Sequence, residues 1–79
     1  MNNKERVFKA ISIALEVKEE VLSEDTAIGD FPNWDSMGHL IIISELEKEF
    51  DIKFDPEDMM EFEDIGDMIG AIEEYTSIK

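Results

Sequence analysis

The sequence predicts an all-α domain: a small four-helix bundle of three longer helices and one short helix, with a long first loop. Apolar residues recur at intervals of three and four along three segments, which is the spacing of one helix face. The run that would also suit a strand, the isoleucines at 41–43, has no second strand to pair with. A chain of 79 residues forms one domain, here residues 1–79.

Composition and charge limit the classes of function. The chain has 21 acidic and 7 basic residues, a net charge of −14, and no cysteine. This charge argues against binding nucleic acid or anionic membranes and favours partners with basic patches. Without cysteine there are no disulfides, thiolate metal sites or cysteine nucleophiles. No targeting segment and no membrane-spanning run is visible, so a cytoplasmic monomer without membrane insertion is expected.

The first predicted helix covers residues 3–17. Its basic residues, Lys4, Arg6 and Lys9, lie near its start, the unfavourable end of the helix dipole for positive charge. The apolar face is therefore expected to hold this helix in place. That face consists of Val7, Phe8, Ile11, Ala14 and Leu15.

A loop is predicted over residues 18–35, because Gly, Pro, Asn, Asp and Ser are frequent there. Long loops inside compact domains tend to be functional. Five apolar side chains are expected to pin this loop to the core: Val21, Leu22, Ile28, Phe31 and Trp34.

The second helix is predicted over residues 37–50, with Asp35 and Ser36 as candidate N-caps. It carries more apolar residues than one face needs. The core face is expected to consist of Ile42, Ile43, Leu46 and Phe50. An exposed side is then expected to present Met37, Leu40 and Ile41.

The rest of the chain predicts an extended link at 51–54, a short helix and a last helix. Pro56 suits the first position of the short helix, with Asp55, Glu57 and Asp58 near its positive end and with Met59, Met60 and Phe62 as its apolar side. The last helix is expected to begin at Glu63 and Asp64, with Asp64 and Asp67 forming a capping box and with Ile65, Met68, Ile69, Ile72 and Tyr75 facing inward. One shared core is predicted from Phe8, Ile11, Leu15, Ile42, Leu46, Phe50, Ile69 and Ile72.

Two chemical sites are considered and set aside. No segment has the ligand spacing of a calcium-binding loop, so no metal site is predicted, although clustered acids allow weak divalent binding. Asp35, Ser36 and His39 contain the residue types of a hydrolytic triad, but a chain this short has little room for an oxyanion hole and a walled pocket. We therefore expect no catalysis, and His39 is predicted to be an exposed helix residue.

Ser36 lies at a helix start, where free N–H groups and the dipole favour negative charge. It is suited to carry a covalent phosphate ester. The alternative is a plain N-cap, which is the commoner role of such a serine.

The residues around Ser36 resemble a known family. The segment WDSMGHL at 34–40 is similar to the phosphopantetheine attachment motif of acyl carrier proteins. LEKEFDIKF at 46–54 resembles the stretch after the family's second helix, and FEDI at 62–65 resembles its third-to-fourth helix junction. The resemblance covers residues 7–75 and implies an acyl-carrier-like bundle.

This resemblance implies that Ser36 is esterified with 4′-phosphopantetheine from coenzyme A by a separate Mg²⁺-dependent phosphopantetheinyl transferase. The thiol of the arm would then carry acyl or related groups as thioesters, so the chain would be a carrier and not an enzyme. Synthase, ligase or acyl-transferring enzymes with basic docking patches would recognise the surface beside the arm. That surface is expected to include Asp35, Met37, Leu40, Ile41, Glu47, Glu57 and Glu61.

Some positions depart from fatty-acid carriers, which commonly place acids shortly after the serine. This chain has Gly38, His39 and Ile41 there, and FPNW at 31–34 replaces the usual approach to the motif. It resembles a specialised stand-alone carrier more than a housekeeping one. A second hypothesis is a non-covalent acidic adaptor or inhibitor of a basic partner, which would not need Ser36.

Overall fold

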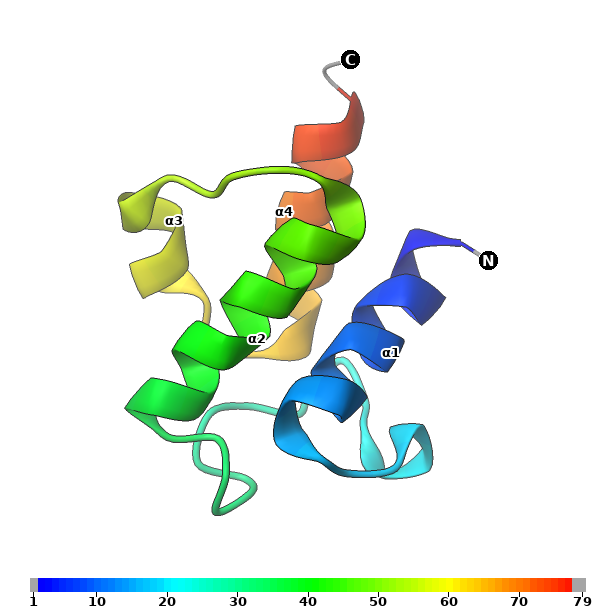
Figure 1. The fold of residues 1–79 in the computed structure, drawn as a ribbon, viewed down its shortest axis with the longest axis vertical. Helices are drawn as coiled ribbons and strands as arrows, with labels where there is room; N and C mark the ends of the chain where they lie inside the picture. Colours follow the sequence, from blue (N-terminus) through cyan, green and yellow to red (C-terminus); the bar gives the residue numbers. More distant parts are fainter. Residues whose placement is uncertain (1, 78–79) are drawn as a thin grey trace.

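The computed structural model describes residues 2–77 and confirms the all-α bundle (Figure 1). The three longer helices are α1 (Asn3–Leu15), α2 (Ser36–Phe50) and α4 (Ile65–Ser77), and the short helix is α3 (Pro56–Glu61). The first loop contains a 3₁₀ turn, η1 (Glu19–Val21), that the sequence pattern did not predict. Within residues 2–77, none of the helices is both long and apolar enough to cross a membrane.

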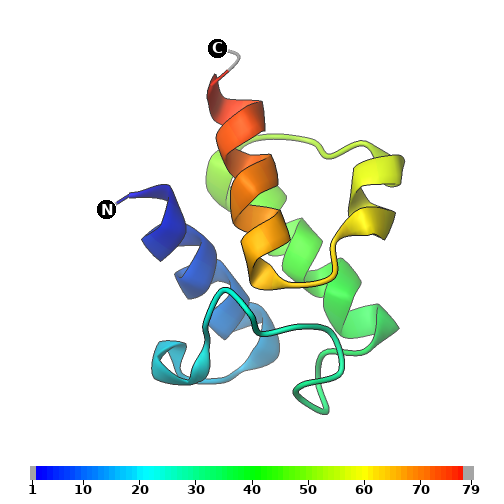
Figure 2. The same ribbon diagram turned by 180° about the vertical axis from the view of Figure 1, so that it is seen from behind.

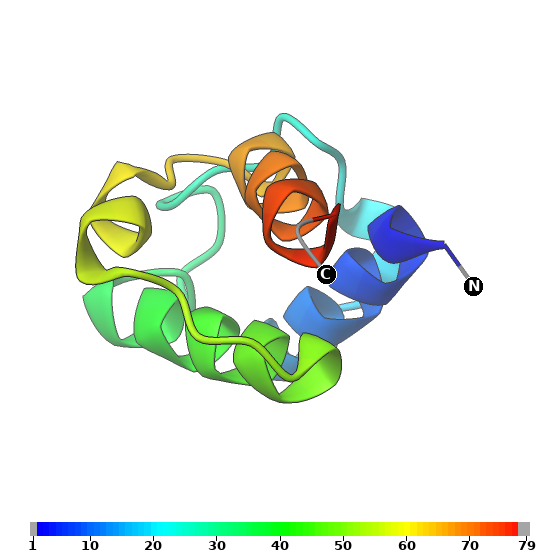
Figure 3. The same cartoon turned by 90° about the horizontal axis from the view of Figure 1, so that it is seen from above.

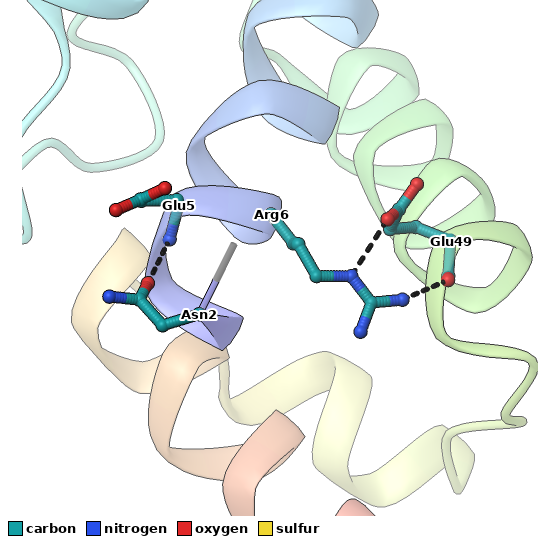
Figure 4. Close-up of polar contacts among 4 residues, drawn as sticks. All are labelled: Asn2, Glu5, Arg6 and Glu49. Atoms are coloured by element: carbon teal, nitrogen blue, oxygen red, sulfur yellow. Dashed lines mark hydrogen bonds and ion pairs between the residues drawn. The ribbon is translucent and has the colours of Figure 1, made fainter.

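Helix α1 begins after Asn2, whose side chain accepts a hydrogen bond from the Glu5 amide at 2.8 Å (Figure 4). It ends two residues before the predicted Val17. Glu16 takes a left-handed conformation with φ of 57°, and its amide donates back to Ile13 and Ser12. This reversal closes the helix at Leu15.

The basic start of α1 is held by polar contacts as well as by the apolar face, which corrects the sequence-based expectation. Arg6 Nε donates to Glu49 Oε2 at 2.8 Å, and Arg6 Nη2 donates to the Glu49 carbonyl at 2.7 Å (Figure 4). The guanidinium also lies 4.3 Å from the centroid of the Phe50 ring. Lys4 pairs with Glu24 at 2.7 Å. Arg6 thus joins the start of α1 to the end of α2, and Figure 1 shows the two helices running in opposite directions.

The predicted core is confirmed except for Phe8, which is only half-buried and packs against its edge. The core also takes in aromatic residues from outside the three longer helices, among them Trp34, which was expected to pin the first loop to the core. Trp34 is 1% exposed, and Phe54 and Phe62 pack edge to face with centroids 5.2 Å apart. The buried apolar set is Val7, Ala10, Ile11, Leu15, Trp34, Ile42, Ile43, Leu46, Phe50, Phe54, Phe62, Ile65, Met68, Ile69 and Ile72.

The first loop passes beneath the C-terminal end of α1 and the N-terminal end of α4, as Figure 2 shows. Its backbone caps α4: the Ile65 amide donates to the Thr26 carbonyl at 3.0 Å, and the Gly66 amide to the Glu24 carbonyl at 2.9 Å. The loop is therefore pinned partly by hydrogen bonds. Val21 and Ile28 do not pin it as expected, since they are 53% and 45% exposed.

The start of α4 confirms the predicted acidic cap with a shift of one residue. Asp64 Oδ1 accepts from the Asp67 amide at 2.8 Å, and Asp67 Oδ2 accepts from the Glu63 amide at 3.0 Å. The helix itself begins at Ile65, after the pair Glu63 and Asp64. Tyr75 is half-buried against the core, as its inward-facing position predicted.

The apolar side predicted for α3 is partly wrong. Met60 is 86% exposed, and Phe62, though buried, follows the end of the helix at Glu61. Met59 packs half-buried against the core. The six-residue helix makes fewer than two turns, so few of its side chains can face inward.

Candidate functional site

Ser36 is the first residue of α2, and its side chain is exposed. The sequence left open whether it is a plain N-cap, and the structure gives that role to Asp35. Asp35 Oδ1 accepts from the Gly38 amide at 2.9 Å. Within residues 2–77, the Ser36 hydroxyl makes no hydrogen bond. The hydroxyl is therefore free to react at the N-terminal end of a 15-residue helix.

The start of α2 suits an attached phosphate. Amides of the first helical turn point out of the helix, and the dipole adds partial positive charge there. The first turn of α2 contains no acidic side chain, whereas α1, α3 and α4 each have at least one there. Asp35 is the one acid at the cap, and its carboxylate is engaged with Gly38. An anion esterified to Ser36 would meet favourable backbone charge without a competing carboxylate in that turn.

Gly38 explains one of the departures from fatty-acid carriers. A Cβ atom at this position would collide with the backbone carbonyl oxygen of Asn33. Asn33 is itself held in place, because its side-chain amide donates to the Leu15 carbonyl at 3.0 Å. The loop thus packs directly on the first turn of α2, and only glycine leaves room for this approach.

His39 is half-buried, so its predicted exposed position is wrong. The Trp34 indole N–H donates to His39 Nδ1 at 3.1 Å, and His39 Nε2 lies 3.2 Å from the Met59 carbonyl oxygen. The Trp34 and His39 rings lie nearly parallel, with an interplanar angle of 16°. Trp34, His39 and Met59 therefore form a bridge from the first loop through α2 to α3. Periodicity could not predict it, because Met59 lies 20 residues from His39.

The same contacts rule against a hydrolytic triad. Both ring nitrogens of His39 are engaged by Trp34 and Met59, and the Asp35 carboxylate receives the Gly38 amide. Asp35, Ser36 and His39 lie close together in the sequence, but their side chains form no hydrogen bonds with one another.

Apolar side chains surround the helix start on its outer side. As predicted, α2 exposes Met37, Leu40 and Ile41, which are 72%, 61% and 46% exposed. Among the large apolar residues of the part of the chain that the structure describes, Met60 of α3 is the most exposed, at 86%. Sequence reasoning missed Met60 because it placed all three apolar residues near α3 on one inner side.

The acidic residues named from the sequence occupy different environments. Glu57 and Glu61 are exposed on α3. Glu47 is half-buried, and its Oε2 accepts from the Phe54 amide at 3.0 Å. Glu47 therefore stabilises the link after α2 in addition to any role at the surface.

Helix α3 is also tied to α4. The Tyr75 hydroxyl donates to Asp58 Oδ2 at 2.8 Å and accepts from the Asp55 amide at 2.9 Å. The Asp55 amide by itself lowers the pKa of the phenol. The bond to the Asp58 carboxylate, burial and the charges of both aspartates outweigh it and raise the pKa of Tyr75 above its ordinary 10.0.

Comparison with known proteins agrees with this geometry. Residues 5–72 match the family model described as a phosphopantetheine attachment site. A search of curated proteins gives no significant match. Within residues 2–77, no three His, Asp or Glu side chains are grouped so that they could hold a metal ion.

The family match spans well over half of the chain and includes the whole of α2 with its exposed serine. Domains of this family carry covalently attached 4′-phosphopantetheine and are typically carriers without catalytic activity. The bundle, the free Ser36 hydroxyl and the matched residues lead to one conclusion: the chain belongs to the phosphopantetheine-attachment family and is an acyl-carrier-type domain.

Proposed function

We propose that Ser36 is the residue that carries 4′-phosphopantetheine and that the chain is a carrier of acyl or related groups. The observation that carries this proposal is the division of roles at the start of α2. Asp35 caps the helix, so the Ser36 hydroxyl is exposed and uncommitted at the positive end of the dipole. A cap role would have engaged this hydroxyl.

The attached group supplies a thiol, on which cargo is held as a thioester; the chain has no thiol of its own. The chain's own residues do the rest. Ser36 provides the oxygen that forms the phosphate ester, and the positive end of the α2 dipole favours the charge of that ester. Gly38 and Asn33 keep the loop packed against this turn, so the serine sits on a rigid element.

The surface beside Ser36 is proposed to dock the phosphopantetheinyl transferase and the enzymes that load or use the cargo. Its apolar centre is Met37, Leu40 and Ile41, which are exposed on α2. Its acidic rim is proposed to be Asp35, Glu47, Glu57 and Glu61. With a net charge of −14, the domain should attract basic patches, and salt should slow that association.

The cargo pathway is proposed to be a specialised biosynthetic one and not housekeeping fatty-acid synthesis. Gly38 and His39 support this, because both are committed to contacts with Asn33, Trp34 and Met59. Fatty-acid carriers commonly offer acids to their partners at this stretch. A partner of this chain must therefore recognise a different surface.

The absence of cysteine gives a direct assay. After incubation with coenzyme A and a phosphopantetheinyl transferase, the intact mass should rise by one 4′-phosphopantetheine, and a thiol titration should give one thiol per chain. Ser36→Ala should give neither. Ser44→Ala, a second exposed serine of α2, is the matched control and should be modified like the wild type.

Modification that persists in Ser36→Ala would refute the site. A wild-type protein that is never modified, yet binds a basic partner with Ser36→Ala unaffected, would instead support a non-covalent acidic adaptor. Repeating the modification at rising salt tests the docking surface, because an affinity that does not change with salt would leave recognition to Met37, Leu40 and Ile41.

A further inference from the structure

The bridge through His39 has a defined direction of hydrogen bonding. An indole N–H can only donate, so His39 Nδ1 accepts from Trp34 and carries no proton. The ring proton therefore lies on Nε2, which donates to the Met59 carbonyl. His39 thus links a buried tryptophan of the loop to the backbone of α3.

Few side-chain contacts hold helix α3 in its place in the bundle. None of its six residues is buried, and its N-cap Asp55 makes no side-chain capping bond. Tyr75 ties its first turn to α4 through Asp55 and Asp58. On the other side, the His39 bond at Met59 ties it to α2. Figures 1 and 3 show α3 beside the N-terminal half of α2, at the far side of the bundle from α1.

We propose that His39 is a positioning residue that fixes α3 beside Ser36, so that the exposed side chains of α2 and α3 form one docking surface. Met59 is held at its carbonyl, and Met60, the next residue, is 86% exposed. By fixing α3, the bridge of Trp34, His39 and Met59 thus determines the position of Met60 relative to Met37 and Leu40. This inference rests on the carrier function proposed above.

The test compares three substitutions that remove different parts of the bridge. His39→Phe keeps a ring and removes both hydrogen bonds. His39→Asn can place its oxygen near the former Nδ1 and keep the Trp34 bond. His39→Gln can place its amide near the former Nε2 and keep the bond to Met59.

The first measurement is the kinetics of modification by a phosphopantetheinyl transferase with coenzyme A. For His39→Phe and His39→Asn, we expect KM for the carrier to rise about five- to tenfold, roughly 1–1.4 kcal/mol, with kcat within about twofold. His39→Gln should restore KM, because it restores the bond to α3. A wild-type KM in all three variants would overturn the proposal and leave the bridge as a core contact.

The control is Arg6→Gln, which removes the polar tie at the other end of α2. Arg6 contacts Glu49, 13 residues or about 20 Å along the helix from Ser36. It should lower thermal stability without raising KM. A rise in KM like that of His39→Phe would show that any loss of stability has this effect, and would also overturn the proposal.

A second measurement does not depend on Ser36 being modified. In wild type and in His39→Phe, both unmodified, NMR records the hydrogen exchange of the α3 amides and the single indole resonance of Trp34. We expect exchange of the Met59 amide to become about tenfold faster in His39→Phe, with the Ile42 and Leu46 amides of α2 unchanged. His39→Asn should keep a native-like indole resonance but show the same fast exchange at α3. Unchanged exchange at α3 would refute positioning by His39, whether or not Ser36 carries the arm.

Discussion

Gly38→Ala and Gly70→Ala are the same substitution in two helices, and the structure predicts opposite effects. At Gly38 the new methyl group collides with the Asn33 backbone carbonyl, which a rotamer change cannot relieve. The loop must move, and it carries both the Asn33 bond to Leu15 and the buried Trp34. At Gly70, in the interior of α4, a Cβ would meet nothing within 4 Å.

The magnitudes follow from these surroundings. Overpacking at Gly38 costs about 1–3 kcal/mol, and a weakened Asn33 bond adds about 0.5–1.5 kcal/mol. The better helix propensity of alanine returns at most about 1 kcal/mol. We therefore expect Gly38→Ala to lower the free energy of unfolding by roughly 1–3 kcal/mol. Gly70→Ala gains only the propensity, so it should raise the free energy of unfolding by about 0.5–1 kcal/mol and Tm by roughly 2–8 °C.

The assay is urea unfolding followed by circular dichroism and by the emission of Trp34, the chain's only tryptophan. Gly38→Ala should also shift the native emission to the red, because a displaced loop admits water to the indole. Gly70→Ala should leave that emission unchanged. If Gly38→Ala proves as stable as the wild type with unchanged emission, the close packing of Asn33 on α2 is wrong.

Three further outcomes are expected. Because the pKa of Tyr75 is raised in the fold, its contribution to stability is present below about pH 10 and is lost as pH rises through the raised value. Alkaline melts of wild type should therefore fall more steeply than those of Tyr75→Phe, and equal slopes would contradict the bond to Asp58. Glu47→Ala should lower the free energy of unfolding by about 1 kcal/mol. Glu47→Gln should lower it by less, since its amide oxygen can still accept from the Phe54 amide. Equal losses of the two variants in urea titrations would argue against that bond. Leu46 is fully buried, so Leu46→Ala should cost about 2–5 kcal/mol in the same titration, and a loss below about 0.5 kcal/mol would mean that the helix face is misassigned.

The sequence by itself determined the helices and which face of α2 is buried. Apolar spacing assigned Ile42, Ile43, Leu46 and Phe50 to the core and Met37 to the exposed side, and the structure confirms each. Periodicity succeeds here because burial of a helix face is decided by residues three and four positions apart. The segment around Ser36 also pointed to the family, since a short motif at a helix start is local information.

Only the tertiary structure decided the polar contacts between elements. Arg6 binds Glu49, 43 residues away, and His39 joins Trp34 to Met59, so His39 is half-buried although its helix position suggested exposure. Such contacts depend on how far one helix or loop is shifted and rotated against another. The spacing of residues within one helix does not determine that shift or rotation. For the same reason the need for glycine at position 38 becomes visible only when the Asn33 carbonyl is seen lying against α2.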